Sequence, residues 1–110
     1  MTTADLIAHA SLSIANARER QSKLGLRGEP VNCISGFIGD QSRHLFNNLG
    51  TLADCRYLEV GILHGASLLS TCYGNAVRAV AIDDWRSQDW SPNPAAVKAN
   101  IEKFRGESHV

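Results

Sequence analysis

The stretch from Arg56 to Trp85 reads RYLEVGILHGASLLSTCYGNAVRAVAIDDW and decides the fold of the chain. A short apolar run and a glycine turn come first, then a compact helical segment, and then a second apolar run that ends in two acids. This order predicts a strand, a helix and a second, parallel strand. Such a crossover is right-handed in nearly all proteins, so Gly61 and Asp83 are expected at the same edge of the sheet. Ligands of open α/β sheets bind at that edge.

The composition of the whole chain excludes several classes of protein. Its 110 residues allow one small domain. Eleven basic and eleven acidic residues cancel, so the basic field typical of nucleic-acid binders is absent. Three cysteines without C-x-x-C spacing predict reduced thiols, with neither a disulfide framework nor a metal site. No run approaches the ~18 apolar residues of a membrane span. We therefore expect a cytoplasmic protein without nucleic-acid or membrane partners.

An amphipathic helix is expected over residues 3–24. Thr2 and Asp5 resemble a capping box at its start, and Gly25 suits its C-terminal end. Apolar residues recur at helical spacing and predict one buried stripe. The stripe consists of Leu6, Ile7, Ala10, Ile14 and Ala17.

A glycine-rich loop then leads to a second helix, predicted over residues 41–49 with Asp40 as its N-cap and Gly50 at its end. Its expected buried face is Leu45, Phe46 and Leu49. The two strands, residues 57–60 and 77–82, are nearly all apolar, so we expect both of their faces to be covered.

The helix between the strands is expected to begin at Gly65 and end at Gly74, with Leu68, Leu69 and Cys72 inward. A last helix should begin at Asn93-Pro94 and bury Val97, Ile101 and Phe104. The chain stops at Val110, where a third strand is expected.

The glycine turn does not match two common nucleotide sites. A P-loop requires a lysine, and none follows Gly65. A dinucleotide loop requires a second glycine where this chain has Leu63, which disfavours NAD. The pattern present is Glu59-x-Gly61-x-x-x-Gly65-x-Ser67, and its leading acid repels a pyrophosphate but suits an ammonium group.

An acid at the end of the second strand completes the pattern. Asp83 follows Gly61 by 22 residues, close to the ~20 that separate a glycine turn from a ribose-binding acid. Its carboxylate can accept two hydrogen bonds from a ribose diol. Together these residues favour a nucleoside that carries an amino acid.

The combined pattern resembles the class I S-adenosylmethionine-dependent methyltransferases. LEVGILHGASLLS and VAIDDW match a branch with an E-x-G-x-x-x-G-x-S loop and an I-D-x-[WF] strand end. SGFIGDQSRHLFNNLG and PNPAAVKANIEKFRG are similar to the flanking helices, so the resemblance covers roughly residues 33–107. It implies an α/β, Rossmann-like methyltransferase fold in part. Residues 1–32 would be an N-terminal helix and loop, and residues 33–110 the N-terminal part of the cofactor-binding domain.

The resemblance implies S-adenosyl-L-methionine as cofactor and gives each part of the pattern a role. Glu59 and the backbone of residues 61–65 would face its methionine part, with the helix start beside its carboxylate. Asp83 would hold the ribose, and the next two residues would lie near the adenine. The implied cofactor-binding residues are Glu59, Gly61, Ile62, Gly65, Ser67, Asp83, Asp84 and Trp85.

The family normally continues through several more strands, which carry most substrate and catalytic residues. The chain is therefore expected to be a methyltransferase, or its truncated cofactor-binding N-terminal portion, with a small molecule or sugar as acceptor and no catalytic residue identified. One alternative is a non-catalytic module that acts through a protein partner or self-association. Another is an enzyme that uses NAD or a nucleoside sugar.

Single residues also keep simpler interpretations. Glu59 could form an ion pair with Arg56 or Arg78, and the glycines could serve the turn alone. Trp85 and Trp90 could cover the core, and His64 could face solvent rather than act as a base.

Overall fold

The computed structural model describes residues 1–86 and 94–110. Two parallel strands lie side by side in it, with Arg56 opposite Arg78 and Val60 opposite Ile82. The predicted α/β class and the strand–helix–strand order are thus confirmed. The elements are α1 (Thr3–Arg18), the 3₁₀ helix η1 (Val31–Cys33), α2 (Asp40–Leu49), β1 (Arg56–Val60), α3 (Ala66–Cys72), β2 (Arg78–Ile82) and α4 (Pro94–Phe104).

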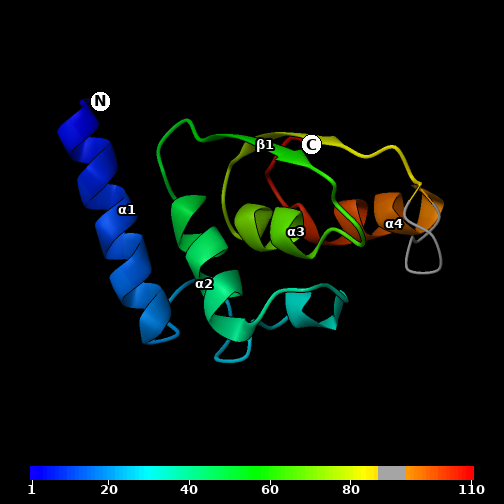
Figure 1. The fold of residues 1–110 in the computed structure, drawn as a ribbon, viewed down its shortest axis with the longest axis horizontal. Coiled ribbons are helices and arrows are strands. Elements are labelled where there is room, and N and C mark those ends of the chain that lie inside the picture. Colours follow the sequence, from blue (N-terminus) through cyan, green and yellow to red (C-terminus); the bar gives the residue numbers. More distant parts are fainter. Residues whose placement is uncertain (87–93) are drawn as a thin grey trace.

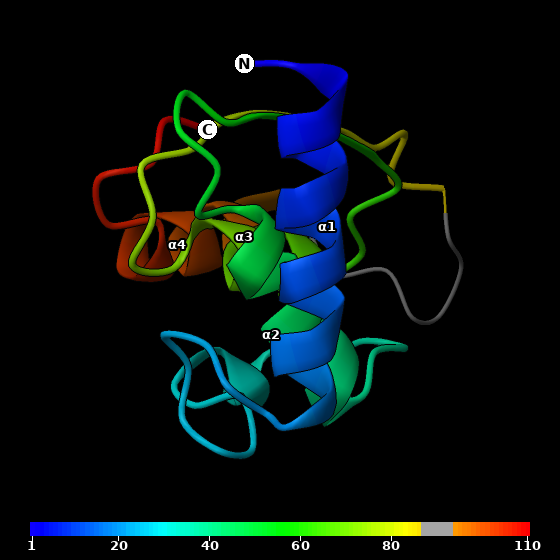
Figure 2. The same ribbon diagram turned by 90° about the vertical axis from the view of Figure 1, so that its left-hand side faces the viewer.

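The helices form a row that begins beneath the sheet. Figure 1 shows α3 and α4 on one side of the strands, with α2 beside α3 and α1 outermost. The turned view in Figure 2 shows α1 upright in front of α2, with α3 and α4 again on one side of the strands. None of the described elements covers the opposite face of the sheet.

Helix α3 lies at the centre of the packing. Leu68, Leu69 and Cys72 have no exposed surface, as the sequence predicts. One apolar cluster joins this helix to the loop before α2 and to α4, and a second joins it to the strands. The first consists of Leu24, Val31, Ile34, Ala66, Leu69 and Phe104, and the second of Cys55, Leu68, Cys72, Val77 and Ala79.

The expectation that both strand faces are covered is wrong. Burial alternates along β1 and β2, which means that one face is packed and the other is open. The open face carries four large apolar side chains that are 53–73% exposed. Helices lie on only one side of the described sheet, so the alternate residues remain uncovered. The four are Leu58, Val60, Val80 and Ile82.

Helix α1 begins as predicted but packs through a different face. Thr2 and Asp5 form the reciprocal capping box, with backbone-to-side-chain distances of 2.9 and 3.1 Å. The helix ends at Arg18 rather than residue 24. The expected apolar stripe is confirmed only at Ala17, which is buried together with Ser13. The larger stripe residues Leu6, Ile7 and Ile14 are exposed.

Helix α1 lies close to α2 because its buried residues, Ser13 and Ala17, are small. The side-chain amide of Asn48 on α2 donates a hydrogen bond of 3.2 Å to the backbone carbonyl of Ser13. A large apolar side chain at position 13 would separate the two helices. The contact between α1 and α2 is therefore close and partly polar. A pattern of apolar residues in the sequence does not predict such a contact.

Helix α2 also buries a polar face. Its N-cap is Gly39 rather than the predicted Asp40, which is the first residue of the helix, and Gly50 closes the helix as predicted. The predicted buried face is wrong, since Leu45, Phe46 and Leu49 are only half-buried. Each buried polar side chain has hydrogen-bond partners, which offsets the cost of removing it from water. The buried residues are Arg43, His44, Asn47 and Asn48.

The C-terminal part packs back on the sheet. Val97 and Phe104 of α4 are buried and Ile101 is half-buried, while Asn93 and Trp90 lie outside the described residues. His109 forms a parallel bridge with Arg78, on the side of β2 away from β1. The backbone at His109 thus adds a single bridge to the edge of the sheet beside β2. No described helix is long and apolar enough to cross a membrane.

Candidate functional site

The glycine turn joins β1 to α3 at the carboxyl end of the sheet. Gly61 and Gly65 have φ angles of +81° and +93°, which glycine adopts without the strain caused by a side chain. The amide of Gly61 donates to the carbonyl of Ile82 at 2.7 Å and so extends the pairing of the strands into the turn. The left-handed Gly65 is the N-cap of α3. These two glycines therefore serve the backbone geometry of the turn.

Glu59 lies on the covered face of β1 and is 9% exposed. Its Oε1 accepts hydrogen bonds from the hydroxyls of Tyr57 and Ser67, at 2.5 and 2.6 Å. Its Oε2 is buried and has no hydrogen-bond partner among the described residues. A buried carboxylate oxygen without a partner costs free energy, so this atom is suited to an external donor or cation.

The hydrogen bonds of Glu59 affect its neighbour. Burial, and then the hydrogen bond to Glu59, hold the pKa of Tyr57 well above its usual value. The interpretation of Glu59 as the partner of Arg56 or Arg78 is wrong. Both arginines stand on the open face at alternate strand positions, opposite to the face of Glu59.

Asp83 closes the site from the end of β2. Its Oδ2 accepts from the amides of Ile62 and Leu63, at 2.9 and 3.3 Å, and its Oδ1 accepts from the amide of Trp85 at 2.8 Å. The Trp85 amide first, and then the two turn amides, lower the pKa of Asp83 below its usual value. The structure thus brings Asp83 and the glycine turn together at one edge of the sheet.

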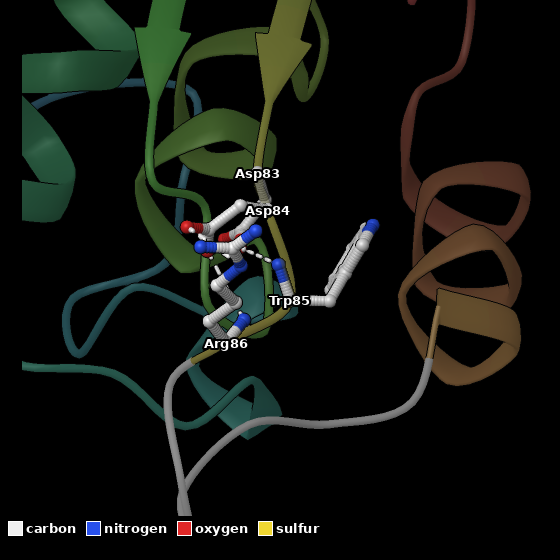
Figure 3. Close-up of polar contacts among 4 residues, drawn as sticks. All are labelled: Asp83, Asp84, Trp85 and Arg86. Atoms are coloured by element: carbon white, nitrogen blue, oxygen red, sulfur yellow. Dashed lines mark hydrogen bonds and ion pairs between the residues drawn. The ribbon is translucent and has the colours of Figure 1, made fainter.

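The residues after Asp83 point in different directions. Figure 3 shows the Trp85 ring directed away from the acids, towards the side on which α4 lies. Trp85 has a φ of +58°. The Oδ1 of Asp84 accepts from the amide of Arg86 at 3.0 Å, and its Oδ2 is 4.0 Å from the Arg86 guanidinium. Asp84 and Trp85 are exposed, while His64 in the turn is half-buried.

A cavity of about 340 Å³ lies beside the glycine turn. This volume is within the range of small-molecule sites. Ser67 lines it and donates a hydrogen bond to the Oε1 of Glu59, so the buried carboxylate is one hydrogen bond away from the cavity lining. The lining residues are Ser35, Gly36, Phe37, Ile38, Ser42, Phe46, Gly61, Ile62, Leu63, Ala66 and Ser67.

The segment of residues 35–38 forms one wall of this cavity and lies tightly against α3. A Cβ atom added to Gly36 would be 2.9 Å from the Cβ of Ala66, closer than real side chains approach. Glycine at position 36 therefore permits the wall to lie on the first turn of α3. Any larger residue would move this wall or the helix.

Arg43 holds the backbone that leads into this wall, a role that is not apparent from the sequence. It is 5% exposed, and its guanidinium donates to the carbonyls of Val31 and Ile34 at 3.0 and 2.8 Å. Burial lowers the pKa of Arg43. Backbone carbonyls have no sequence signature, so no pattern could have identified these contacts.

The site combines three chemical features. A buried carboxylate with one unpartnered oxygen is hydrogen-bonded to the cavity lining, a hydrogen-bonded aspartate lies at the strand end, and apolar side chains line the space between α2 and the turn. No group of three His, Cys, Asp or Glu side chains in residues 1–86 and 94–110 could hold a metal ion. The arrangement suits an organic ligand that carries both a cation and hydroxyl groups.

Comparisons with protein-family models, with curated proteins and with solved structures find no match to this chain.

Proposed function

We propose that the chain binds S-adenosyl-L-methionine and is the cofactor-binding portion of a methyltransferase with a small-molecule or sugar acceptor. The observation that carries this proposal is Glu59, a buried acid that has one unpartnered oxygen and is hydrogen-bonded to the lining of a ligand-sized cavity. The resemblance of the glycine turn and of the strand end to class I methyltransferases gives the proposal its specific ligand. Bound S-adenosyl-L-methionine supplies an electrophilic methyl group.

Glu59 fits the amino-acid part of this ligand. An ammonium group has three donors and a positive charge, and the Oε2 of Glu59 is an acceptor that lacks a partner. Binding of the ammonium, directly or through a water, would offset the cost of this buried charge. Tyr57 and Ser67 hold the other oxygen and so fix the orientation of the carboxylate.

Asp83 fits the ribose in part. A carboxylate offers about four acceptor positions, and three backbone amides already use this one. One acceptor position of the Asp83 carboxylate therefore remains free, whereas the two hydroxyls of a ribose diol need two. The contact with the Leu63 amide is the longest of the three, at 3.3 Å, so it is the contact that a second hydroxyl would replace.

Titration calorimetry with S-adenosylmethionine and with S-adenosylhomocysteine tests the proposal. We expect both to bind, and we expect Glu59→Gln to weaken binding about tenfold, which corresponds to about 1.4 kcal/mol. Asp83→Asn should weaken it similarly. Asp54→Asn is the matched control, since this exposed acid precedes β1 at the opposite end of the strand and should leave affinity within about twofold.

A structural readout accompanies the Glu59 variant. Because Glu59 contributes to the raised pKa of Tyr57, Glu59→Gln should lower that pKa, as measured by the ultraviolet absorbance of tyrosinate during alkaline titration. Tyr57→Phe identifies which absorbance change belongs to this residue. The proposal fails if the unaltered chain binds neither compound, or if both site variants bind as well as the control.

A further inference from the structure

The open face of the sheet has an ordered pattern of side chains. Three rows cross the two strands on this face, and the register pairs Arg56 with Arg78 in the first. The second row is Leu58 with Val80, and the third is Val60 with Ile82. Both apolar rows are more than half exposed. A hollow of about 610 Å³ lies at the basic end, where His109 and Val110 also line it.

One end of this face is basic, and an acid lies in the segment beyond the other end. Within residues 1–86 and 94–110, no acidic group forms an ion pair with Arg56 or Arg78. At the other end, Asp84 lies two residues beyond Ile82, in the segment that follows the end of β2. Its only ion pair among the described residues is the exposed 4.0 Å contact with Arg86, which contributes little. Along β2 and the segment after it, the order is therefore basic, apolar, apolar and acidic, at Arg78, Val80, Ile82 and Asp84.

We propose that this face docks against the same face of a second copy of the chain, with the strands antiparallel. A two-fold axis lying between the faces, perpendicular to the strands and near Ala81, brings Val80 against the partner's Ile82. The same operation places Arg78 against the partner's Asp84. Each contact occurs twice, because the two-fold axis relates the two copies. When the order of residues 78, 80, 82 and 84 is reversed, the basic position meets the acidic one and the apolar positions meet each other.

Charge distinguishes this arrangement from its alternative. Parallel strands would set arginines against arginines and acids against acids, which costs several kcal/mol in a desolvated interface. Antiparallel docking removes the apolar rows from water and places each Arg78 near an acid of the other copy, whereas each Arg56 faces the turn that follows β1. Sheets that pack face to face lie about 10 Å apart, a distance at which such side chains interdigitate.

The size of the face sets the expected strength. Four apolar side chains and the charged row of each copy make an interface smaller than the ~800 Å² per partner of standard complexes. We therefore expect a dissociation constant on the order of 10–100 μM. Sedimentation equilibrium between about 1 μM and about 1 mM should show a rise from the monomer mass of 11.9 kDa towards twice that value.

Charge reversal tests the proposed register. Arg78→Glu and Asp84→Arg should each weaken self-association more than about tenfold, because each places like charges together twice. An equal mixture of the two variants should associate again, since every such contact between the two different chains is complementary. The proposal is overturned if the mixture stays monomeric, or if either variant alone associates like the unaltered chain.

A second pair of variants tests the position of the interface. Val80→Lys inserts a charge into the centre of the face and should abolish association. Leu12→Lys makes the same kind of change at an exposed apolar residue of α1 and should not affect it. Loss of association in Leu12→Lys but not in Val80→Lys would place the interface on α1 and contradict the proposal. Circular dichroism checks that each variant is folded.

Discussion

Asp83 shows how a single carboxylate can connect two strand ends. It accepts hydrogen bonds from the turn that follows β1 and from the residue two positions after itself. Hydrogen bonds to a charged acceptor are stronger than those between neutral groups. The side chain is not fully buried, so solvent screening reduces this contribution.

The depressed pKa of Asp83 predicts a pH-dependent contribution to stability. A carboxylate with a lowered pKa stabilises the fold above the unfolded pKa of about 3.9, and this stabilisation is lost as pH falls through the folded pKa. Asp83→Asn should therefore lower the free energy of unfolding by about 1 kcal/mol at pH 7. Urea unfolding should show the difference shrinking as the pH falls below about 4. A difference that is constant between pH 7 and pH 3 would contradict this account.

At the scale of helices, the contact between α2 and α3 depends on hydrogen bonds and on one glycine. The side-chain amide of Asn47 donates to the carbonyls of Ser70 and Tyr73, and that of Asn75 donates back to the carbonyl of Asn47. These bonds require the backbones to lie close together. Gly50 allows this, because a Cβ there would be 2.3 Å from the Thr71 carbonyl oxygen.

Gly50→Ala should destabilise the protein by about 2 kcal/mol or more, because it forces α2 away from α3 and stretches their hydrogen bonds. The φ of Gly50 is −66°, so alanine is acceptable for the backbone and the effect is steric. Gly39→Ala is the matched control, since nothing lies within 4 Å of its added Cβ. Chemical unfolding of both variants makes the measurement. Equal losses of stability would show that the approach of the helices is not the cause.

These helix contacts explain which predictions failed. Local rules predicted the capping box of α1, the end of α2 at Gly50 and the inward face of α3, because nearby residues determine each of them. Apolar periodicity predicts only Ala17 of the buried face of α1 and none of the buried residues of α2. Both helices pack through small or amide side chains whose partners are distant backbone carbonyls, and such contacts leave no local pattern.

The whole molecule is organised around α3, which belongs to both apolar clusters. This arrangement places the three cysteines in different surroundings. Cys33 is exposed, whereas Cys55 and Cys72 are buried in the cluster beneath the sheet. Burial raises the pKa of Cys72 to about 11 and also raises the pKa of Cys55. The two buried thiols are therefore protonated and inaccessible at neutral pH.

A chromogenic thiol reagent should thus react with one cysteine quickly in the native protein and with all three after unfolding. The fast reaction should disappear in Cys33→Ser. The slow reaction should report the opening of the cluster, and its rate should rise when urea destabilises the fold. Two fast thiols in the native protein would contradict the burial described here.

The sequence predicts only the part of the candidate site that follows from the order of strand, helix and strand along the chain. The glycine turn and Asp83 meet because a parallel crossover brings both strand ends to one edge. The strand pattern gives Tyr57 no role at the site, although its hydroxyl donates a hydrogen bond to Glu59. The cavity wall at residues 35–38 depends on Arg43, whose role arises from a distant backbone contact.

Arg43 also affects how this cavity could diverge during evolution. The wall at residues 35–38 follows a backbone that the arginine holds from α2, although Arg43 is absent from the cavity lining. A substitution at position 43 would shift the wall while every lining residue stays the same. Related chains with identical lining residues could therefore select ligands of different size, and a survey of lining positions alone would miss the difference.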